Sequence, residues 1–286
     1  GRTSLHRAVE KNYISCVKEI LIQGGNVNLR EKWWSRTPLH IACEKGHAEC
    51  VQHLIAYGAD VNMWAKEGWT PLILAVYNGQ IDCVKLLLKA KANLFLRTSN
   101  DYQALHYASK QNYDEIAQLL IAHGANPSSR VVDKGPTPLH VAAEANAGGV
   151  VSVLLGNGAD TNARDLKGMA PLHNAVQGGC LQATHALISH YTCDLHIKNN
   201  EDQDPLDVCI QKFRNSSSTK AMQQTLAYVR KAYSDEVAKT KPQIDTKADY
   251  SFLESDSPNA GTDMADVKSN ASATEQLTQF QSQLKT

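Results

Sequence analysis

The sequence lacks an excess of charge of either sign, because its 286 residues carry 29 basic and 29 acidic side chains. A protein that coats nucleic acid or an anionic membrane needs a basic surplus, so the balance argues against both as the main ligand. No apolar run approaches the roughly 18 residues of a membrane span, and no signal-like apolar segment opens the chain. We therefore expect no nucleic-acid binding and no membrane insertion, and a cytoplasmic or, alternatively, nuclear protein.

A disulfide framework and a zinc module are also missing. The seven cysteines are odd in number, and no two of them form a C-x-x-C pair. Three of them, Cys16, Cys50 and Cys83, occupy one position of the repeat described below, where other units carry Ile116 and Val150. We interpret these cysteines as small buried hydrophobic residues of a reducing compartment.

Catalytic signatures are absent as well: the sequence has no nucleophile elbow, no phosphate-binding loop and no dinucleotide fingerprint. The sequence has one local cluster of histidine and cysteine, which comprises His185, His190, Cys193 and His196. Their spacing does not match a known set of metal ligands on one helix face. We predict that the chain is not an enzyme and holds no cofactor and no metal. An enzyme elsewhere in a longer parent chain remains the alternative.

What the sequence does have is an internal repeat. The segment Thr-Pro-Leu-His-Ile-Ala at 37–42 returns as Thr-Pro-Leu-His-Val-Ala at 137–142, and weaker copies lie before, between and after these two. The leucine of this segment recurs at intervals of 33 or 34 residues, at Leu5, Leu39, Leu72, Leu105, Leu139, Leu172 and Leu206. Seven units in one phase indicate a repeat protein.

The chemistry of one unit predicts its local structure. Thr37 is suited to capping a helix with its hydroxyl. Pro38 suits the first helical position, because a backbone N–H at that position has no partner within the helix and its absence costs no hydrogen bond. Gly46 ends this helix, the apolar spacing over 48–55 predicts a second one, and Gly58 ends that. Two antiparallel helices and a projecting turn form each unit, which must stack on its neighbours to bury an apolar face.

Three features carry a resemblance to a known family: the Thr-Pro-Leu-His-x-Ala segment, the Gly-Ala-Asp-x-Asn turns at 58–62 and 158–162, and the period of the repeat. Through them the chain resembles the ankyrin-repeat family over residues 1 to about 233. The resemblance implies an all-α solenoid of seven helix-turn-helix repeats with β-hairpin loops. The polar seventh unit predicts a C-terminal cap of a domain over residues 1–233. Residues 234–286, with five basic and nine acidic side chains, predict a disordered polar tail. Because Gly1 opens within a recognisable unit, we expect that further repeats or another domain precede it.

Histidine recurs at the position after the repeat leucine, which indicates a structural role in every unit rather than a ligand site. The residues are His6, His40, His106, His140 and His173.

Aromatic residues gather in the loops of the first repeats. All four tryptophans lie there, and the resemblance implies that hairpin tips and inner-helix ends contact partners on the concave side. Tryptophan is also enriched at the centres of protein interfaces. Packing of these rings against adjacent hairpins is the alternative. The predicted partner-binding residues are Trp33, Trp34, Trp64, Trp69, Tyr77, Tyr102, Arg36 and Lys66.

Later hairpins carry a modest basic ridge that includes Arg97, Arg130 and Arg164, which predicts either a site for an acidic peptide or a solvated face. We expect a monomeric interaction module that binds a protein or peptide partner and acts as a scaffold, adaptor or regulator. The alternative is the substrate-targeting region of a larger enzyme, such as a ubiquitin ligase or a kinase. No leucine-rich ligase-recruiting box is visible in the tail.

Overall fold

The computed structural model describes residues 2–215 and 219–240. These residues form fourteen α-helices in seven pairs: α1 (Ser4–Glu10) and α2 (Ile14–Ile22), α3 (Pro38–Lys45) and α4 (Ala48–Ala56), α5 (Pro71–Tyr77) and α6 (Ile81–Lys89), α7 (Ala104–Lys110) and α8 (Asp114–Ala122), α9 (Pro138–Glu144) and α10 (Gly148–Gly156), α11 (Pro171–Gly178) and α12 (Leu181–Ile188), and α13 (Pro205–Asn215) and α14 (Lys220–Thr240). A short 3₁₀ helix, η1 (Lys66–Gly68), lies between α4 and α5.

Helix α3 begins and ends where the sequence chemistry of its unit places the signals. In α3, Thr37 is extended at φ −85° and ψ 167°, Pro38 is the first helical residue, and Gly46 ends the helix at φ 76°. Glycine adopts the left-handed conformation at little energetic cost because it has no β-carbon. Gly46 therefore reverses the chain toward α4 without strain. The predicted start and end of the first helix are therefore confirmed.

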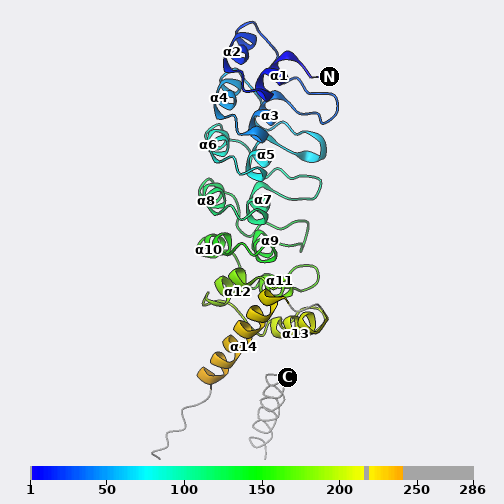
Figure 1. Ribbon diagram of the computed structural model, residues 1–286, viewed down its shortest axis with the longest axis vertical. Helices are drawn as coiled ribbons and strands as arrows, with labels where there is room; N and C mark the ends of the chain where they lie inside the picture. Colours follow the sequence, from blue (N-terminus) through cyan, green and yellow to red (C-terminus); the bar gives the residue numbers. More distant parts are fainter. Residues whose placement is uncertain (1, 216–218, 241–286) are drawn as a thin grey trace, which may run out of the picture. The chain divides into compact units, whose positions relative to one another are not determined.

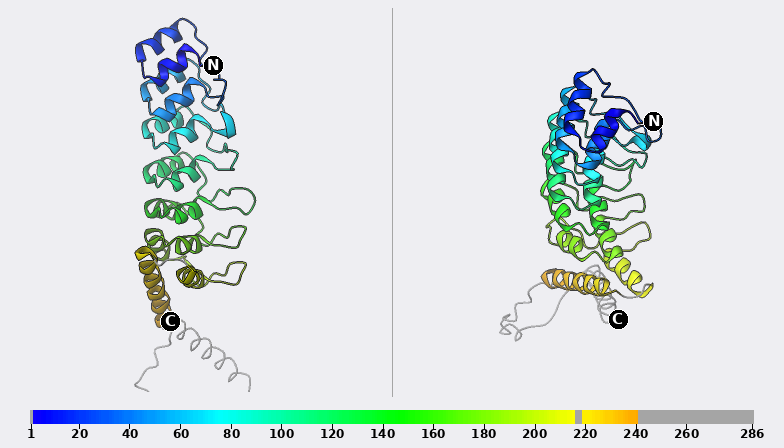
Figure 2. Two further views of the ribbon diagram at one scale, coloured as in Figure 1. Left: turned by 45° about the vertical axis from the view of Figure 1, so that its right-hand side comes forward. Right: turned by 45° about the horizontal axis from the view of Figure 1, so that its top comes forward.

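The pairs stack in order through residues 1–229. First helices contact first helices of the next repeat, as α3 contacts α5, and second helices do the same, as α4 contacts α6. Figure 1 shows the two rows side by side with the loops projecting from the row of first helices, and Figure 2 shows the same layers from two other directions. The all-α solenoid of seven repeats is confirmed.

The core is a continuous apolar layer between the two rows of helices. The repeat leucine is buried in every unit, with exposed fractions between 0% and 3%. Each repeat buries its apolar face only against its neighbours, so the stability of the stack depends on every interface along it.

Six loops project between successive repeats, and we call them hairpins 1 to 6: residues 30–36, 63–69, 97–102, 130–136, 164–169 and 198–203. Each is closed by one backbone hydrogen bond, such as Glu31 N to Arg36 O at 2.8 Å and Ala65 N to Trp69 O at 2.7 Å. The predicted chain reversals are present. None of the described residues forms a β-strand, because one closing bond does not build a ladder.

The chain divides into two compact units, residues 1–229 and 230–286. Helix α14 runs through both this boundary and the predicted one between residues 233 and 234, so the latter stays a prediction. The predicted disordered tail lies, from residue 241 onward, outside the described residues. Within the described part, no helix has the length and apolar character needed to cross a membrane.

Candidate protein-binding surface

The recurring histidines join each repeat to the hairpin of the next one. In the second repeat, Thr37 N donates to His40 Nδ1 at 3.1 Å, and His40 Nε2 donates to the backbone oxygen of Trp69 at 3.1 Å. Because one nitrogen accepts and the other donates, the ring has to be the neutral Nε2–H form. The predicted structural role of these histidines is confirmed by the same bond to the next hairpin at His6, His140 and His173.

Burial keeps these rings neutral. Loss of hydration lowers the pKa of His40 and of His106 to about 4, outweighing the backbone hydrogen bonds that favour the charged ring at His40. His106 is the exception in bonding, because the backbones of Ser129 and Pro136 influence its pKa but no group completes a hydrogen bond to its Nε2 atom. Hairpin 4 therefore lacks the histidine bond that hairpins 1, 2, 5 and 6 have.

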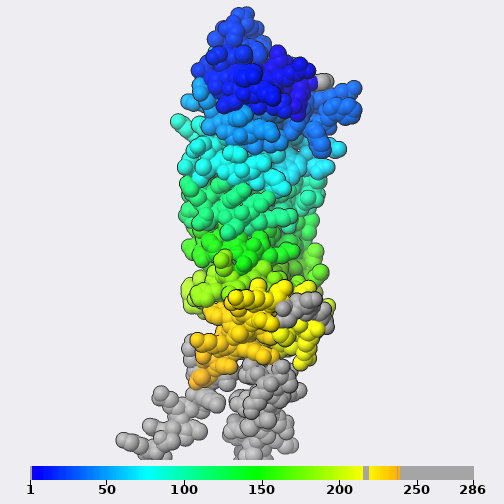
Figure 3. Space-filling model, viewed as in Figure 1, coloured from blue at the N-terminus to red at the C-terminus, as the bar shows by residue number. Residues whose placement is uncertain are grey.

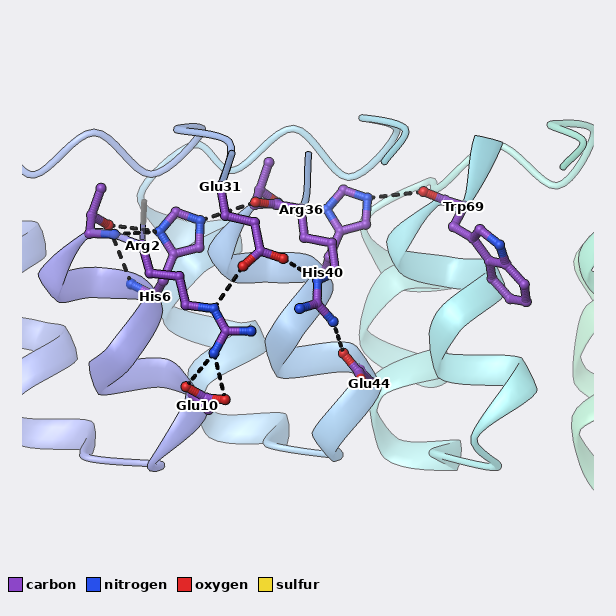
Figure 4. A network of polar contacts seen from close by, with 10 residues as sticks. Arg2, His6, Glu10, Glu31, Arg36, His40, Glu44 and Trp69 are labelled. Carbon is purple, nitrogen blue, oxygen red and sulfur yellow. Dashed lines mark hydrogen bonds and ion pairs between the residues drawn. The ribbon is translucent and has the colours of Figure 1, made fainter. Parts of the chain in front are cut away.

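A buried carboxylate fixes hairpin 1, as Figure 4 shows. Glu31 is 4% exposed and accepts from Arg2 Nε at 2.7 Å and from Arg36 Nε. Arg36 also donates to Glu44 of α3 at 2.7 Å. Burial alone would raise the pKa of Glu31, but hydrogen bonds from Arg36 and Arg2 hold it below its usual value. The carboxylate is charged and ties hairpin 1 to Arg2 of the first repeat, and Arg36 extends the link to Glu44 of the second repeat.

Three of the four tryptophans project into solvent. Trp33 is 78%, Trp34 53% and Trp64 59% exposed. In the space-filling view of Figure 3, hairpin 1 is the blue projection at the upper right. A backbone hydrogen bond of 2.9 Å from Lys66 N to Trp34 O joins hairpins 1 and 2, so the backbones that carry these rings are linked to each other.

Each projecting indole carries a cation of the chain over its face. The Arg30 guanidinium lies 4.7 Å from the Trp64 ring centre, and Lys66 Nζ lies 5.3 Å from that of Trp34. A third pair joins Lys32 and Trp33 at 5.8 Å. These pairs cover part of the ring faces and orient the rings.

Trp69 differs from the other tryptophans because its ring is half-buried in an aromatic cluster. Its centroid lies 5.3 Å from that of Tyr77 and 5.0 Å from that of Tyr107, and Tyr102 lies 5.4 Å from Tyr107. The cluster spans the third and fourth repeats and leaves Tyr77 41% exposed. Sequence reasoning missed Tyr107, although its repeat position holds aliphatic residues such as Leu74 elsewhere.

A recess of about 160 Å³ lies between hairpins 1 and 2. Trp34, Trp69 and Leu74 provide apolar walls, and Arg36, Glu44 and Lys66 lie around them. Its volume suits one side chain of a partner. Of the two predicted cations, Lys66 is exposed, whereas Arg36 is engaged by Glu31 and Glu44 and so positions the hairpin.

A second and larger hollow, of about 730 Å³, lies along the later repeats. Amide side chains are the largest group in its lining, beside charged and apolar residues: Asn174, Gln177, Asn199, Asn200, Gln203 and Gln211. The face made by the first helices and hairpins is thus charged at the first repeat, aromatic in the middle and rich in amides at the end. Sequence reasoning did not identify this amide-rich part.

The predicted basic ridge is used within the structure. Arg97 Nη1 donates to the backbone oxygen of Arg130 at 2.8 Å, and Arg130 Nη1 donates to that of Arg164 at 2.9 Å. These bonds link successive hairpins and reduce the number of N–H groups that an acidic ligand would find. Among the residues that the structure describes, no group of three or more His, Cys, Asp or Glu side chains is arranged to hold a metal ion.

Comparisons with known proteins place this architecture. A family model described as ankyrin repeats in three copies matches residues 5–98 and 90–165. The chain is 31% identical over 145 residues to the putative ankyrin repeat protein FPV031 of fowlpox virus, covering 49% of this chain and 42% of that protein. It is also 31% identical over 150 residues to the probable 26S proteasome regulatory subunit p28 of Saccharomyces cerevisiae, covering 51% of this chain and 65% of that protein.

The solved structure of the human ASB11 ankyrin repeat domain aligns with a TM-score of 0.67 and 29% identity, over 79% of this chain and 97% of that one. The chain spans less than two thirds of the length of the two curated relatives. The family match extends over more than half of the sequence, and the chain belongs to the ankyrin-repeat family.

Proposed function

We propose that residues 1–233 form a domain that binds a protein or peptide partner through its concave face and hairpin tips, and that it acts as a monomeric scaffold, adaptor or regulator in the cytoplasm or nucleus. Ankyrin repeats are in general protein-interaction modules, and the yeast relative p28 is named as a regulatory subunit of a larger assembly. The centre of the site is the aromatic surface of hairpins 1 and 2 with the end of α5.

The observation that carries the proposal is the recess between hairpins 1 and 2, flanked by exposed aromatic rings. Trp34 and Trp69 line this recess, and the ring of Tyr77 packs at a steep angle against that of Trp69 while the residue stays 41% exposed. Tryptophan and tyrosine dominate binding energy at protein interfaces because they combine large apolar area with a polar group, and they act best around a pocket. Exposed rings of this kind stabilise an isolated repeat stack little, which favours a role in binding.

Preorganisation supports the same proposal. The His40 bond to Trp69, the Glu31 contacts to two arginines and the backbone bond between hairpins 1 and 2 all fix the backbone that carries the rings before a partner arrives. A partner then docks with little loss of conformational freedom in this domain. The partner's contacting surface is apolar at its centre, with polar groups of both signs at its edge.

The test is an affinity capture from cell lysate with three matched baits: the parent chain, a Trp34→Ala, Trp69→Ala, Tyr77→Ala variant, and a control Phe95→Ala, Tyr191→Ala variant. The control residues are also exposed, at 60% and 93%, but lie outside the hairpins and away from the recess. Circular dichroism confirms that each bait is folded. We expect a partner that the parent and the control retain and the aromatic variant loses. Capture of the same proteins by all three would contradict the proposal.

The alternative function, targeting substrates to an enzyme, stays a prediction. The similarity to p28, a probable 26S proteasome regulatory subunit, is the observation that favours it. The captured partner distinguishes the scaffold from the targeting region. A targeting region captures enzyme substrates, and the abundance of such substrates in the cell changes when the domain is deleted.

A further inference from the structure

The first two repeats carry basic side chains along the groove between their first helices and their hairpins. The repeat register locates this groove, because Leu74 lines the recess, and Asn174 and Val208, at the same repeat position, line the larger hollow. In the first repeat this position holds Arg7, which is exposed. Arg7 therefore lies on the same groove.

A neighbouring repeat position adds two lysines to the groove. Gly178 and Lys212 line the larger hollow. The same position holds Lys11 in the first repeat and Lys45 in the second, and both lysines are exposed. Within residues 2–215 and 219–240, neither lysine forms an ion pair, and Arg7 forms none either. These three basic groups are thus available to the anions of a ligand.

Hairpins 1 and 2 add three more cations beside the recess. Arg30, Lys32 and Lys66 are exposed, and they lie over tryptophan rings rather than against carboxylates. A cation over an indole keeps its charge, so these groups still attract anions. Together, six residues form what we call the cationic groove: Arg7, Lys11, Arg30, Lys32, Lys45 and Lys66.

Arginines neutralise most of the acidic side chains on the same surface. Three carboxylates share two arginines, because Glu10, Glu31 and Glu44 bind Arg2 and Arg36. Glu67 of hairpin 2 is the remaining acid, and in the described part of the chain it forms no ion pair. The surface is therefore locally basic, although the whole chain has no net charge.

We propose that the partner binds through an acidic linear segment whose carboxylates lie in the cationic groove and whose adjacent aliphatic side chain enters the recess. This inference rests on the proposed function and specifies the chemistry of its partner. Charge complementarity carries it, since the groove leads directly to the recess: Glu44, beside Lys45, lines that recess.

The charges at the two ends of the groove also set the direction of the segment. The larger hollow, in the later repeats, is lined by three carboxylates and two lysines: Glu144, Asp165, Glu201, Lys167 and Lys212. An acidic segment is not favoured there. The acidic part of the partner's edge therefore lies toward the first repeat.

A nucleic acid matches this surface less well than an acidic peptide does. Single-stranded nucleic acid binds through bases that stack on open aromatic faces. Cations of the chain already lie over the rings of Trp33, Trp34 and Trp64. The recess, with apolar walls and a volume of about 160 Å³, suits one aliphatic side chain and not a base.

The test selects binders from a random peptide library displayed on phage, with three baits. The baits are the parent chain, a Lys11→Glu, Lys45→Glu variant, and a control Lys89→Glu, Lys91→Glu variant. The control lysines are also exposed and lie at the end of α6, in the row of second helices. Circular dichroism confirms that each bait is folded. We expect the parent and the control to select acidic residues next to one aliphatic residue, and the groove variant to lose the acidic preference.

A selected peptide labelled with fluorescein then gives the affinity by fluorescence anisotropy. We expect the groove variant to bind it at least ~10-fold more weakly than the parent, and the control to bind it within about 2-fold. The affinity of the parent should fall as the NaCl concentration rises.

Two results of the selection would overturn this inference and leave the proposed function standing: enriched peptides without acidic residues, and no enriched peptide at all. Displacement of the selected peptide by oligo(dT) at an equal concentration would also overturn it, because the groove would then be a nucleic-acid site. Failure of the proposed function is recognised separately, by the capture of the same proteins from lysate with and without the aromatic substitutions.

Discussion

His40 Nε2 donates a hydrogen bond of 3.1 Å to the backbone oxygen of Trp69, so a buried histidine of the repeat frame holds an aromatic residue of the proposed binding site. Figure 4 shows the Trp69 carbonyl directed toward His40 and the indole ring directed away from it. The same residue therefore contributes its backbone to the frame and its side chain to the surface.

This coupling predicts that His40→Leu affects both stability and binding. The change leaves the Thr37 N–H and the Trp69 carbonyl without their partner, which costs about 1–3 kcal/mol in the free energy of unfolding. His140→Leu is the matched control, because it removes the equivalent 2.9 Å bond to Met169 in hairpin 5. We expect a similar loss of stability from both variants by urea unfolding, and weaker partner affinity only from His40→Leu. If both variants bound the partner with equal affinity, the hydrogen bond from His40 would not position Trp69 for binding.

The buried histidines also predict acid sensitivity. Burial lowers the folded-state pKa of His40 and His106 from 6.5 to about 4. The unfolded state therefore binds more protons below about pH 6.5, and stability is full above that pH and is lost as the pH falls toward about 4. Each ring contributes a slope of up to about 1.4 kcal/mol per pH unit in this window. Urea unfolding across this pH range measures the slope of the unfolding free energy, which His40→Asn should reduce. An unfolding free energy that did not change with pH would contradict the conclusion that the buried histidines are neutral.

Glu31 is predicted to stabilise hairpin 1 far more than a surface ion pair does. Glu31→Gln leaves Arg2 and Arg36 without their shared anion. We expect a loss of about 1–3 kcal/mol, less than for a fully buried pair because the Arg2 side chain is 34% exposed. Glu49→Gln is the control: Glu49 pairs with Lys18 at 3.2 Å but is 55% exposed, and its loss should stay below about 1 kcal/mol. Similar losses in urea unfolding would argue against the buried clamp.

Substitutions of Asn146 distinguish the contribution of backbone strain from that of hydrogen bonding in the turn between α9 and α10. Asn146→Gly keeps the left-handed conformation but loses two bonds to the start of α12, which costs about 1–2 kcal/mol. Asn146→Ala loses the same bonds and also places a β-carbon at φ 56°, which adds about 1 kcal/mol. Thermal unfolding should rank the three proteins in that order. If alanine were tolerated as well as glycine, the turn would not require a left-handed residue.

The repeat register predicts the fold because its signals are local. A cap, a proline, a leucine and a turn residue recur within each unit, and their effects do not depend on distant partners. The side of the molecule on which Trp33, Trp34 and Trp64 project follows from the same register. The expectation that Cys16 is buried is wrong: its side chain is exposed, whereas Cys50 at the same repeat position is buried and contacts Asn12 of the preceding repeat.

The electrostatics of the site could not be predicted from sequence. Arg36 was grouped with Lys66 as a partner-binding cation, yet its guanidinium contacts Glu31 and Glu44. Arg2 reaches Glu31 across 29 positions, and only the folded stack brings them together. Tyr107 was missed for a similar reason, since its contact with Trp69 joins two repeats.

The most direct test of the proposed function is hydrogen–deuterium exchange of the full chain with and without its captured partner. We expect the partner to slow exchange in hairpins 1 and 2 and at the end of α5, and to leave α4 and α6, in the row of second helices, unchanged. Protection confined to the second helices, with hairpins 1 and 2 unaffected, would contradict the account and move the site to the opposite face.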